Sequence, residues 1–359
     1  LSLAANQNFK DAQFKLGVIY YEGIYVERDI NKSIYYYSLA ANQNFPDAQY
    51  NLGQIYYERI YIERDINKAI HYYSLAANQN YPKAQNNLGS IYYLGEYVER
   101  DINKAIYYFS LAANQNFTES QYNLGLIYYE GKYVEHDINK AIHYLSLAAN
   151  QNFKDAQFKL GVIYYEGIYV ERDINKSIYY FSLAANQNFP KAQYNLGLIY
   201  YEGKYVDRDI NKIIHYFSLA ANQNYLYAEF YLGIIYYEGK YVERSINKAI
   251  YYFSLAANQN YAKAQYNLGQ IYYEGKYIER DINKAIQYYS LAANQNHLYA
   301  EFFLGVIYYE GKYIERDINK AIHYYSLASN QNDMISQFNL GNFYYEGKYI
   351  LRNIHKAIH

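Results

Sequence analysis

The chain has 359 residues, with 33 Lys and Arg residues against 34 Asp and Glu residues and a formal net charge of −1. These charges are scattered evenly, so we expect no basic face for nucleic acid. Cysteine is absent, which excludes disulfide bonds and cysteine-based zinc sites and favours an intracellular location. No apolar run reaches the about 18 residues of a membrane span, so we expect no membrane insertion within this segment.

The two ends of the chain fall inside the same kind of segment. Leu1 is not an initiator Met, and His359 interrupts a helical pattern. No signal peptide is visible at the start. We therefore interpret the chain as a piece of a longer protein whose N-terminus is missing.

The phrase SLAANQN returns every 36 residues without any insertion. Repeats of about 20 to 50 residues indicate a solenoid, propeller or array. We therefore expect a single repeat domain over residues 1–359. With small changes the phrase begins at Ser2, Ser38, Ser74, Ser110, Ser146, Ser182, Ser218, Ser254, Ser290 and Ser326.

After the phrase, each repeat continues with the apolar spacing of a helix. In the second repeat this spacing runs through Ala48, Leu52, Ile55 and Tyr56. We name this predicted helix helix A. All three prolines lie at its start, where a missing N–H costs nothing: Pro46, Pro82 and Pro190.

All 19 glycines fall at two positions of the repeat. One position lies inside helix A, as at Gly17 and Gly53, where a missing side chain lets two helices approach closely. The other ends helix A, as at Gly23 and Gly95, and favours a positive φ angle. Arg59 alone interrupts the second position, and we expect a strained turn there.

A second apolar stripe follows in each repeat and predicts helix B. In the second repeat it contains Ile66, Ala69, Ile70, Tyr73, Ala76 and Ala77. An Asn such as Asn44 or Asn80 ends it, in the left-handed conformation that Asn tolerates. The residue before helix B is always a good N-cap type: Asp29, Asp65, Asp101, Asp137, Asp173, Asp209, Ser245, Asp281, Asp317 and Asn353.

The predicted fold is all-α, a right-handed α-solenoid of about ten 36-residue helix-turn-helix repeats. We expect helices A to line a concave face and helices B to form the convex face. Helices this short are marginal alone, and one pair cannot cover its apolar stripes. Each repeat must therefore pack against the next.

The repeat resembles the Sel1-like repeat family, a relative of the tetratricopeptide repeat. The family pattern is an Ala, then Leu-Gly, a Tyr, a Gly, a Val, an Asp, Lys-Ala, an aromatic residue and a closing Ala-Ala. The chain departs from it by having Tyr61 where a second Gly is common and Leu75 where Lys is usual. In the fifth repeat the matching residues are Ala156, Leu160, Gly161, Tyr164, Gly167, Val170, Asp173, Lys176, Ser177, Tyr180, Ala184 and Ala185.

This resemblance implies a non-catalytic scaffold or adaptor for protein–protein interaction, with a protein or peptide as partner and no cofactor. Self-association is a further possibility. Two alternatives remain open at this point. The chain could be a structural spacer between flanking domains, or a regulatory subunit of a separate enzyme.

No catalytic or metal site is expected. Residues that break the repeat, such as His136 and Met334, lie in different repeats and form no set of nucleophile, base and orienting group. His355 and His359 are four residues apart but lack a third ligand. Another histidine position recurs on helix B, and we expect its members to face solvent: His71, His143, His215, His323 and His359.

Tyrosine is the unusual residue, with 57 copies. We expect the positions of Tyr20 and Tyr36 to pack inward, with hydroxyl groups bonded between repeats. By analogy with tetratricopeptide solenoids, the groove should carry the positions of Phe14, Val18, Tyr21 and Glu22. The rings there either pack on one another or bind a partner. The partner-binding hypothesis places a segment across Phe230, Ile234, Tyr266, Phe302 and Val306, with Leu226, Tyr227, Leu298 and Tyr299 beside them.

Overall fold

The computed structural model describes residues 1–24, 26–348 and 351–358. Over these residues the chain contains α-helices and no strand, arranged as a 36-residue repeat, which confirms the predicted fold class. The chain divides into an N-terminal part, Leu1–Ala184, and a C-terminal part, Ala185–His359. Whether both parts belong to one solenoid domain stays a prediction.

Helix A occurs ten times over the described residues and helix B nine times, with two shorter end pieces. The helices A are α2 (Lys10–Glu22), α4 (Pro46–Tyr57), α6 (Pro82–Leu94), α8 (Thr118–Glu130), α10 (Lys154–Glu166), α12 (Pro190–Glu202), α14 (Leu226–Glu238), α16 (Ala262–Glu274), α18 (Leu298–Glu310) and α20 (Met334–Glu346). The helices B are α3 (Ile30–Ala41), α5 (Ile66–Asn78), α7 (Ile102–Ala113), α9 (Ile138–Asn150), α11 (Ile174–Ala185), α13 (Ile210–Ala221), α15 (Ile246–Asn258), α17 (Ile282–Ala293) and α19 (Ile318–Asn330), and the end pieces are α1 (Ser2–Asn6) and α21 (Ile354–Ile358).

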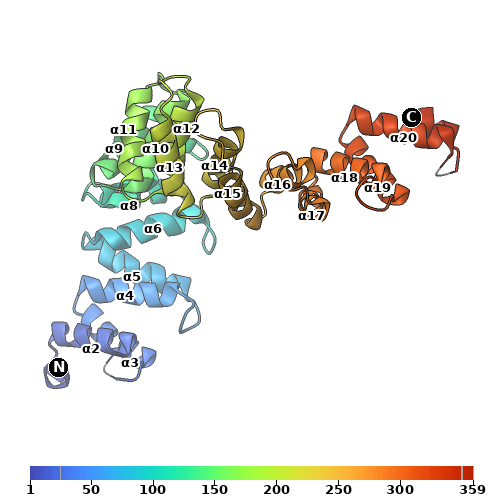
Figure 1. Cartoon of the computed structure of the whole chain (residues 1–359). Coiled ribbons are helices and arrows are strands. Elements are labelled where there is room, and N and C mark those ends of the chain that lie inside the picture. The colour runs from blue at the N-terminus through green and yellow to red at the C-terminus, as the bar shows by residue number, and fades with distance from the viewer. Residues whose placement is uncertain (25, 349–350, 359) are drawn as a thin grey trace. The chain divides into compact units, whose positions relative to one another are not determined.

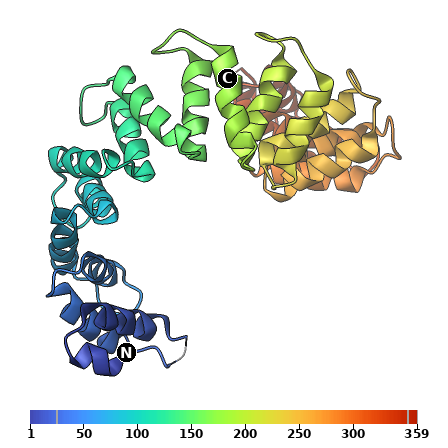
Figure 2. The same ribbon diagram turned by 90° about the vertical axis from the view of Figure 1, so that its left-hand side faces the viewer.

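Within each part, a helix A packs on the helix B that follows it, and that helix B packs on the next helix A. Figure 1 shows this in the N-terminal part, where α2 lies beside α3 and α4 beside α5. Figure 2 shows the same pairs from the side. The stacking that the repeat period predicts is therefore present in both parts.

The ends of helix A follow the prediction with one correction. Gly95 takes φ +65°, and its N–H donates to the carbonyl of Ile91 at 3.1 Å. The expected strain at Arg59 is wrong, because no positive φ occurs there. Helix α4 instead ends at Tyr57, and Glu58 continues in an extended conformation (φ −78°, ψ 137°). Where glycine is missing, helix A therefore ends in an extended residue instead of a left-handed one.

The ends of helix B also follow the prediction. Oδ1 of Asp101 accepts from the backbone N–H of Lys104 at 2.9 Å, and Ser245 and Asn353 cap their helices in the same way. The asparagine at the Asn44 position of each described repeat has a positive φ, which is +54° at Asn44 itself. These residues are therefore structural stops, as expected.

The core of each repeat lies where helix B meets two helices A. An added Cβ at Gly53 would lie 2.5 Å from Cδ1 of Tyr73, so this glycine permits the predicted close approach. The rings of Tyr20 and Tyr36 stack at 5.7 Å but stay half-buried. The fully buried position is the next residue along helix B: Tyr37, Tyr73, Phe109, Leu145, Phe181, Phe217, Phe253, Tyr289 and Tyr325.

Candidate functional site

The predicted partner-binding residues all lie on three helices A of the C-terminal part, α14, α16 and α18. Two of them are exposed, Tyr227 at 44% and Tyr299 at 57%. The others are half-buried: Leu226, Phe230, Ile234, Tyr266, Leu298, Phe302 and Val306. We name these nine residues the aromatic surface.

The half-buried rings of the aromatic surface pack against their own framework. The ring of Phe230 lies 5.8 Å from that of Phe253 and 5.1 Å from that of Tyr261. The ring of Tyr266 stacks on His297 at 4.8 Å. These rings therefore pack against other residues of the solenoid framework and contribute to the stability of the fold.

Tyr227 and Tyr299 form an outer layer over these rings. Tyr227 lies 5.9 Å from Tyr194, and Tyr299 lies 6.1 Å from Tyr266, as centroid distances. Each of these two tyrosines therefore packs against a ring on one side and is exposed to solvent on the other. Rigid, half-supported aromatic side chains of this kind are typical anchors in protein interfaces.

A further aromatic position distinguishes the same two repeats. Most repeats carry Asn on helix A where α14 has Tyr231 and α18 has Phe303. Phe303 stacks on Tyr289 at 5.5 Å, and Tyr231 stacks on Phe217 at 5.4 Å. The apolar character of the helix-A surface therefore increases at these two repeats.

This exchange alters the hydrogen bonding of the buried tyrosine. In the first repeat, burial raises the pKa of Tyr37 to about 12, while the hydrogen bond with Asn51 opposes that rise. Where Phe303 replaces the Asn, the hydroxyl group of Tyr289 is buried and has no partner in the described structure. A Tyr–Asn hydrogen bond between repeats therefore forms at Tyr37 and at Tyr73, which is the position next to Tyr36, where bonded hydroxyl groups were predicted.

In the N-terminal part the helix-A surface contains two hollows. One, of 210 Å³, is lined by Val18, Tyr21, Glu22, Tyr37, Asn51, Gln54 and Ile55. The other, of 200 Å³, is lined by Gln54, Tyr57, Glu58, Tyr73, Asn87, Ser90 and Ile91. Three of the four positions predicted for the groove, those of Val18, Tyr21 and Glu22, line the first hollow. The sequence already places Tyr231 and Phe303, which occupy the Asn51 position in two repeats, on this surface, but it gave no role to Asn51 itself.

Sequence reasoning also missed an arginine that links neighbouring repeats. Nε of Arg100 donates to the carbonyl of Tyr93 at 2.9 Å, and Nη1 donates to the hydroxyl of Tyr133 in the next repeat at 2.8 Å. The same guanidinium lies 4.7 Å from the Tyr133 ring. His136 replaces this arginine once, with its ring 4.1 Å from that of Tyr169. An arginine that recurs at one position in nearly every repeat was the sequence feature that could have indicated this link.

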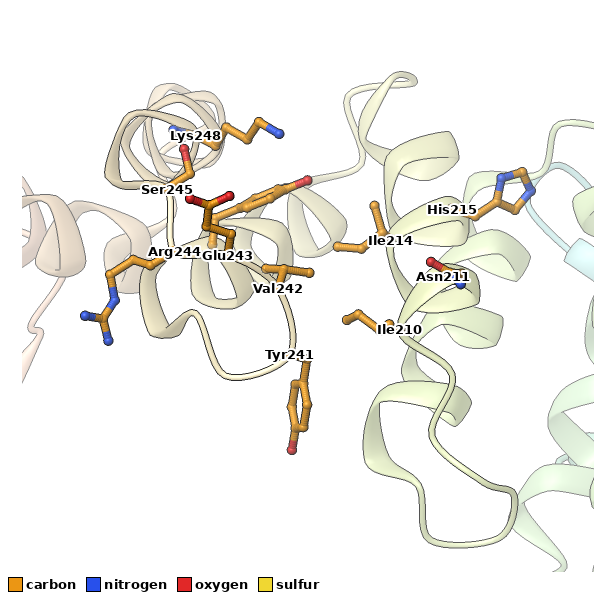
Figure 3. Close-up of a pocket in the computed structure, with 11 residues that line it drawn as sticks. Ile210, Asn211, Ile214, His215, Tyr241, Val242, Glu243, Arg244, Ser245 and Lys248 are labelled. Atoms are coloured by element: carbon orange, nitrogen blue, oxygen red, sulfur yellow. Dashed lines mark hydrogen bonds between the residues drawn. The ribbon is translucent and has the colours of Figure 1, made fainter.

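A hollow of 820 Å³ lies in the C-terminal part between α13 and the loop before α15. In Figure 3, Val242 faces Ile210 and Ile214 across it, while Arg244 points away. The hydroxyl of Ser245 already accepts from the backbone N–H of Lys248 at 3.4 Å. Its lining comes from α13 and from the loop and first turn of α15, so the hollow is a groove between neighbouring repeats.

The recurring histidines of helix B were predicted to face solvent and to bind no metal. His71, His143, His215 and His323 are exposed, and His359 lies outside the described residues. Among the residues that the structure describes, no three His, Asp or Glu side chains come together as ligands. In the same residues, no helix has the length and apolar character needed to cross a membrane.

Comparison with known proteins places these features in a family. The Sel1 repeat model matches ten segments: 10–45, 46–81, 82–117, 118–153, 154–189, 190–225, 226–261, 262–297, 298–333 and 335–359. This confirms the resemblance found in the sequence. A search of curated proteins gave no significant match.

Two solved structures are similar to the chain. One is c5321, a protective antigen of uropathogenic Escherichia coli strains with an SLR fold, at 30% identity and a TM-score of 0.77, covering 99% of this chain and 76% of that one. The other is a Sel1 repeat protein from Oxalobacter formigenes, at 29% identity and a TM-score of 0.70, covering 86% of this chain and 89% of that one.

Proposed function

The chain belongs to the Sel1 repeat family, and we propose that it is a non-catalytic adaptor that holds a partner protein or extended peptide on the aromatic surface. Proteins of this family generally mediate protein–protein interactions, and they are typically scaffolds without catalytic activity. The aromatic surface lies on one kind of helix, helix A, within one part of the chain. A partner segment lying across α14, α16 and α18 would contact all of it.

The observation that supports this proposal is the outer layer formed by Tyr227 and Tyr299. Their exposed fractions of 44% and 57% leave room for contact, while the rings of Tyr194 and Tyr266 behind them limit their motion. Burying an aromatic side chain removes a large apolar area from water at a small entropic cost. A partner would gain most of its binding free energy at these two positions.

The structure also decides which substitutions give a clean test. Phe230 and Phe302 support Phe253 and Tyr325 from behind, with ring centroids 5.8 and 6.1 Å apart. Serine at either position would leave a cavity and weaken the fold. Tyr227→Ser and Tyr299→Ser change mainly exposed surface.

The experiment uses a photo-crosslinking amino acid at position 227 or 299, in the cell from which the chain comes. We expect the same partner to be joined to the chain from both positions. The double variant Tyr227→Ser/Tyr299→Ser should then lose that partner by about tenfold or more, with an unchanged helical circular dichroism signal. Tyr251 on α15, which is 59% exposed, is the matched control position and should give no such product.

The alternatives give different results in this experiment. A structural spacer would give no specific product from any position. If the chain is a regulatory subunit, the protein crosslinked to it would be an enzyme. If the partner joins from position 251 instead, or survives the double substitution, the aromatic surface is not the binding site, and the helix-B position of Leu75 is the next to examine.

A further inference from the structure

The two hollows on the helix-A surface of the N-terminal part have the same construction. Each lies between successive helices A and has a tyrosine ring, a carboxylate and an asparagine in its lining. In the first these groups are Tyr21, Glu22 and Asn51. In the second they are Tyr57, Glu58 and Asn87.

The carboxylates of these hollows lack an internal cation. Among the described residues, neither Glu22 nor Glu58 forms a salt bridge, whereas lysines of helices B pair with the N-cap aspartates, as Lys32 does with Asp29. The nearby Arg28 is occupied elsewhere. Its guanidinium donates to the carbonyls of Tyr21 and Glu22 and to the hydroxyl of Tyr61.

One repeat shows what fits into such a hollow. In the fifth repeat, Lys159 stands at the position of Asn51, and its ammonium lies 3.7 Å from the ring centroid of Tyr129, which corresponds to Tyr21. Burial lowers the pKa of Lys159, while the nearby carboxylates of Glu166 and Glu130 raise it. The chain thus places its own lysine against the tyrosine and glutamate that line the equivalent space.

We propose that the hollows at Asn51 and Asn87 bind lysine side chains of a partner protein, so that a lysine-bearing extended segment lies across α2, α4 and α6. An ammonium group is attracted by both the face of a tyrosine ring and a carboxylate. The amide groups of Asn51 and Asn87 leave open the space that Lys159 fills. This surface is separate from the aromatic surface and does not depend on it.

The distance between the hollows suggests the spacing of the lysines. Packed helices lie about 8–10 Å apart, so equivalent points on successive helices A are on the order of 10 Å apart. A chain in the polyproline II conformation advances about 3.1 Å per residue with three residues per turn, so two lysines three residues apart lie on one face at about 9 Å. Lys-X-X-Lys in the polyproline II conformation is the pattern that the surface fits.

The probe is a fluorescent Gly-Ser peptide that carries one Lys-X-X-Lys pair, and the measurement is fluorescence anisotropy with the 359-residue chain. We expect binding that weakens with salt, and no binding of a peptide with norleucine in place of lysine. The affinity of the double variant Asn51→Lys/Asn87→Lys for the lysine peptide should be lower by about tenfold or more. Lys159 lies opposite Leu145, whereas Asn51 and Asn87 bond the buried hydroxyl groups of Tyr37 and Tyr73, so the helical circular dichroism signal of the double variant is measured beside its binding. Glu58→Gln should also weaken binding.

A matched control separates the hollows from general charge repulsion. Asn67→Lys/Asn103→Lys adds the same charge on exposed positions of helices B and should leave binding within about twofold. Tyr227→Ser/Tyr299→Ser should leave it unchanged, so this test does not depend on the proposed adaptor surface. The proposal is overturned if the wild-type chain does not bind the lysine peptide, if the norleucine peptide binds equally, or if both lysine variants weaken binding equally.

Discussion

A glutamine on helix A joins neighbouring repeats, and this bond explains part of the repeated phrase. In α16, Nε2 of Gln265 donates to the carbonyl of Ala257 at 3.2 Å. Its Oε1 accepts from Nε2 of Gln295, the glutamine of the following phrase, at 2.8 Å. The buried amide therefore uses both its donor and its acceptor between repeats.

Glutamate replaces this glutamine in two repeats, at Glu229 and Glu301, and both side chains are buried. Oε2 of Glu229 accepts from Gln259 at 2.8 Å, while Oε1 is buried without a partner. Gln193 and Gln265 each donate to the carbonyl eight residues earlier, and the equivalent carbonyl for Glu229 is that of Ala221. A carboxylate cannot donate to a carbonyl, but a protonated carboxyl group can.

Burial raises the pKa of Glu229 and of Glu301 above the ordinary value of 4.5, while hydrogen bonds from Gln259 and Gln331 oppose the rise, as does His323 near Glu301. The folded state therefore holds these protons more tightly than the unfolded state. The contribution of these two carboxyl groups to the free energy of unfolding is therefore greatest at low pH. It is lost as pH rises from 4.5 through the raised pKa values.

We predict that Glu229→Gln/Glu301→Gln removes this loss, because an amide donates at every pH. Urea unfolding should show the double variant to be more stable than the wild type near about pH 8, by about 1–3 kcal/mol per site, with the difference closing near about pH 4. Gln265→Glu is the reverse control and should add a loss of the same kind. Parallel stability profiles for all three proteins would show that these carboxyl groups do not titrate as described.

At the scale of the helix pair, one glycine decides how closely helix A approaches helix B. An added Cβ at Gly161 would lie 2.5 Å from Cδ1 of Phe181, which is closer than real Cβ atoms come. At Gly341, in the last repeat, the nearest atom is the carbonyl oxygen of Ala357 at 3.5 Å. The two positions are equivalent in sequence but differ in what they face.

We therefore predict opposite effects of the same substitution. Gly161→Ala should destabilise the fold by about 1–3 kcal/mol, because the ring of Phe181 must shift within a packed core. Gly341→Ala should be neutral or stabilise by up to about 1 kcal/mol, because alanine favours helix and its Cβ makes only an ordinary van der Waals contact there. Thermal unfolding of the two single variants decides this, and equal effects would mean that the close approach does not determine the role of the glycine.

At the scale of the whole molecule, stability comes from contacts between repeats. The buried cluster of Ala69, Tyr73, Leu88 and Ile91 is built from helix B of one repeat and helix A of the next. The Arg100–Tyr133 and Gln265–Gln295 bonds cross the same kind of boundary. A repeat at a free end lacks one such partner.

We predict that a fragment of two repeats is largely unfolded, while residues 1–184 fold cooperatively. Each added repeat contributes a further interface, so stability should increase with repeat number. Circular dichroism melting of the two fragments, with an intermediate three-repeat fragment, measures this. A sharp transition in the two-repeat fragment would contradict the prediction.

The aromatic surface was only partly predictable from the sequence. The helical phase placed Tyr227 and Tyr299 on helix A, but it could not show that they are exposed while Phe230 is half-buried. The hollows at Asn51 and Asn87 were not predicted, because each is closed by residues of two repeats. Such exposure depends on how two helices A approach each other across helix B.

The sequence by itself determined the repeat period, the helix type and the helix ends. Asp101, Asn44 and Gly95 act on the backbone within a few residues, so their effect is local and can be read without the fold. Only the tertiary structure decided that Tyr37 rather than Tyr36 fills the core, and that Arg100 reaches Tyr133. Those choices depend on the angle and register at which neighbouring repeats pack, which arise only once the helices meet.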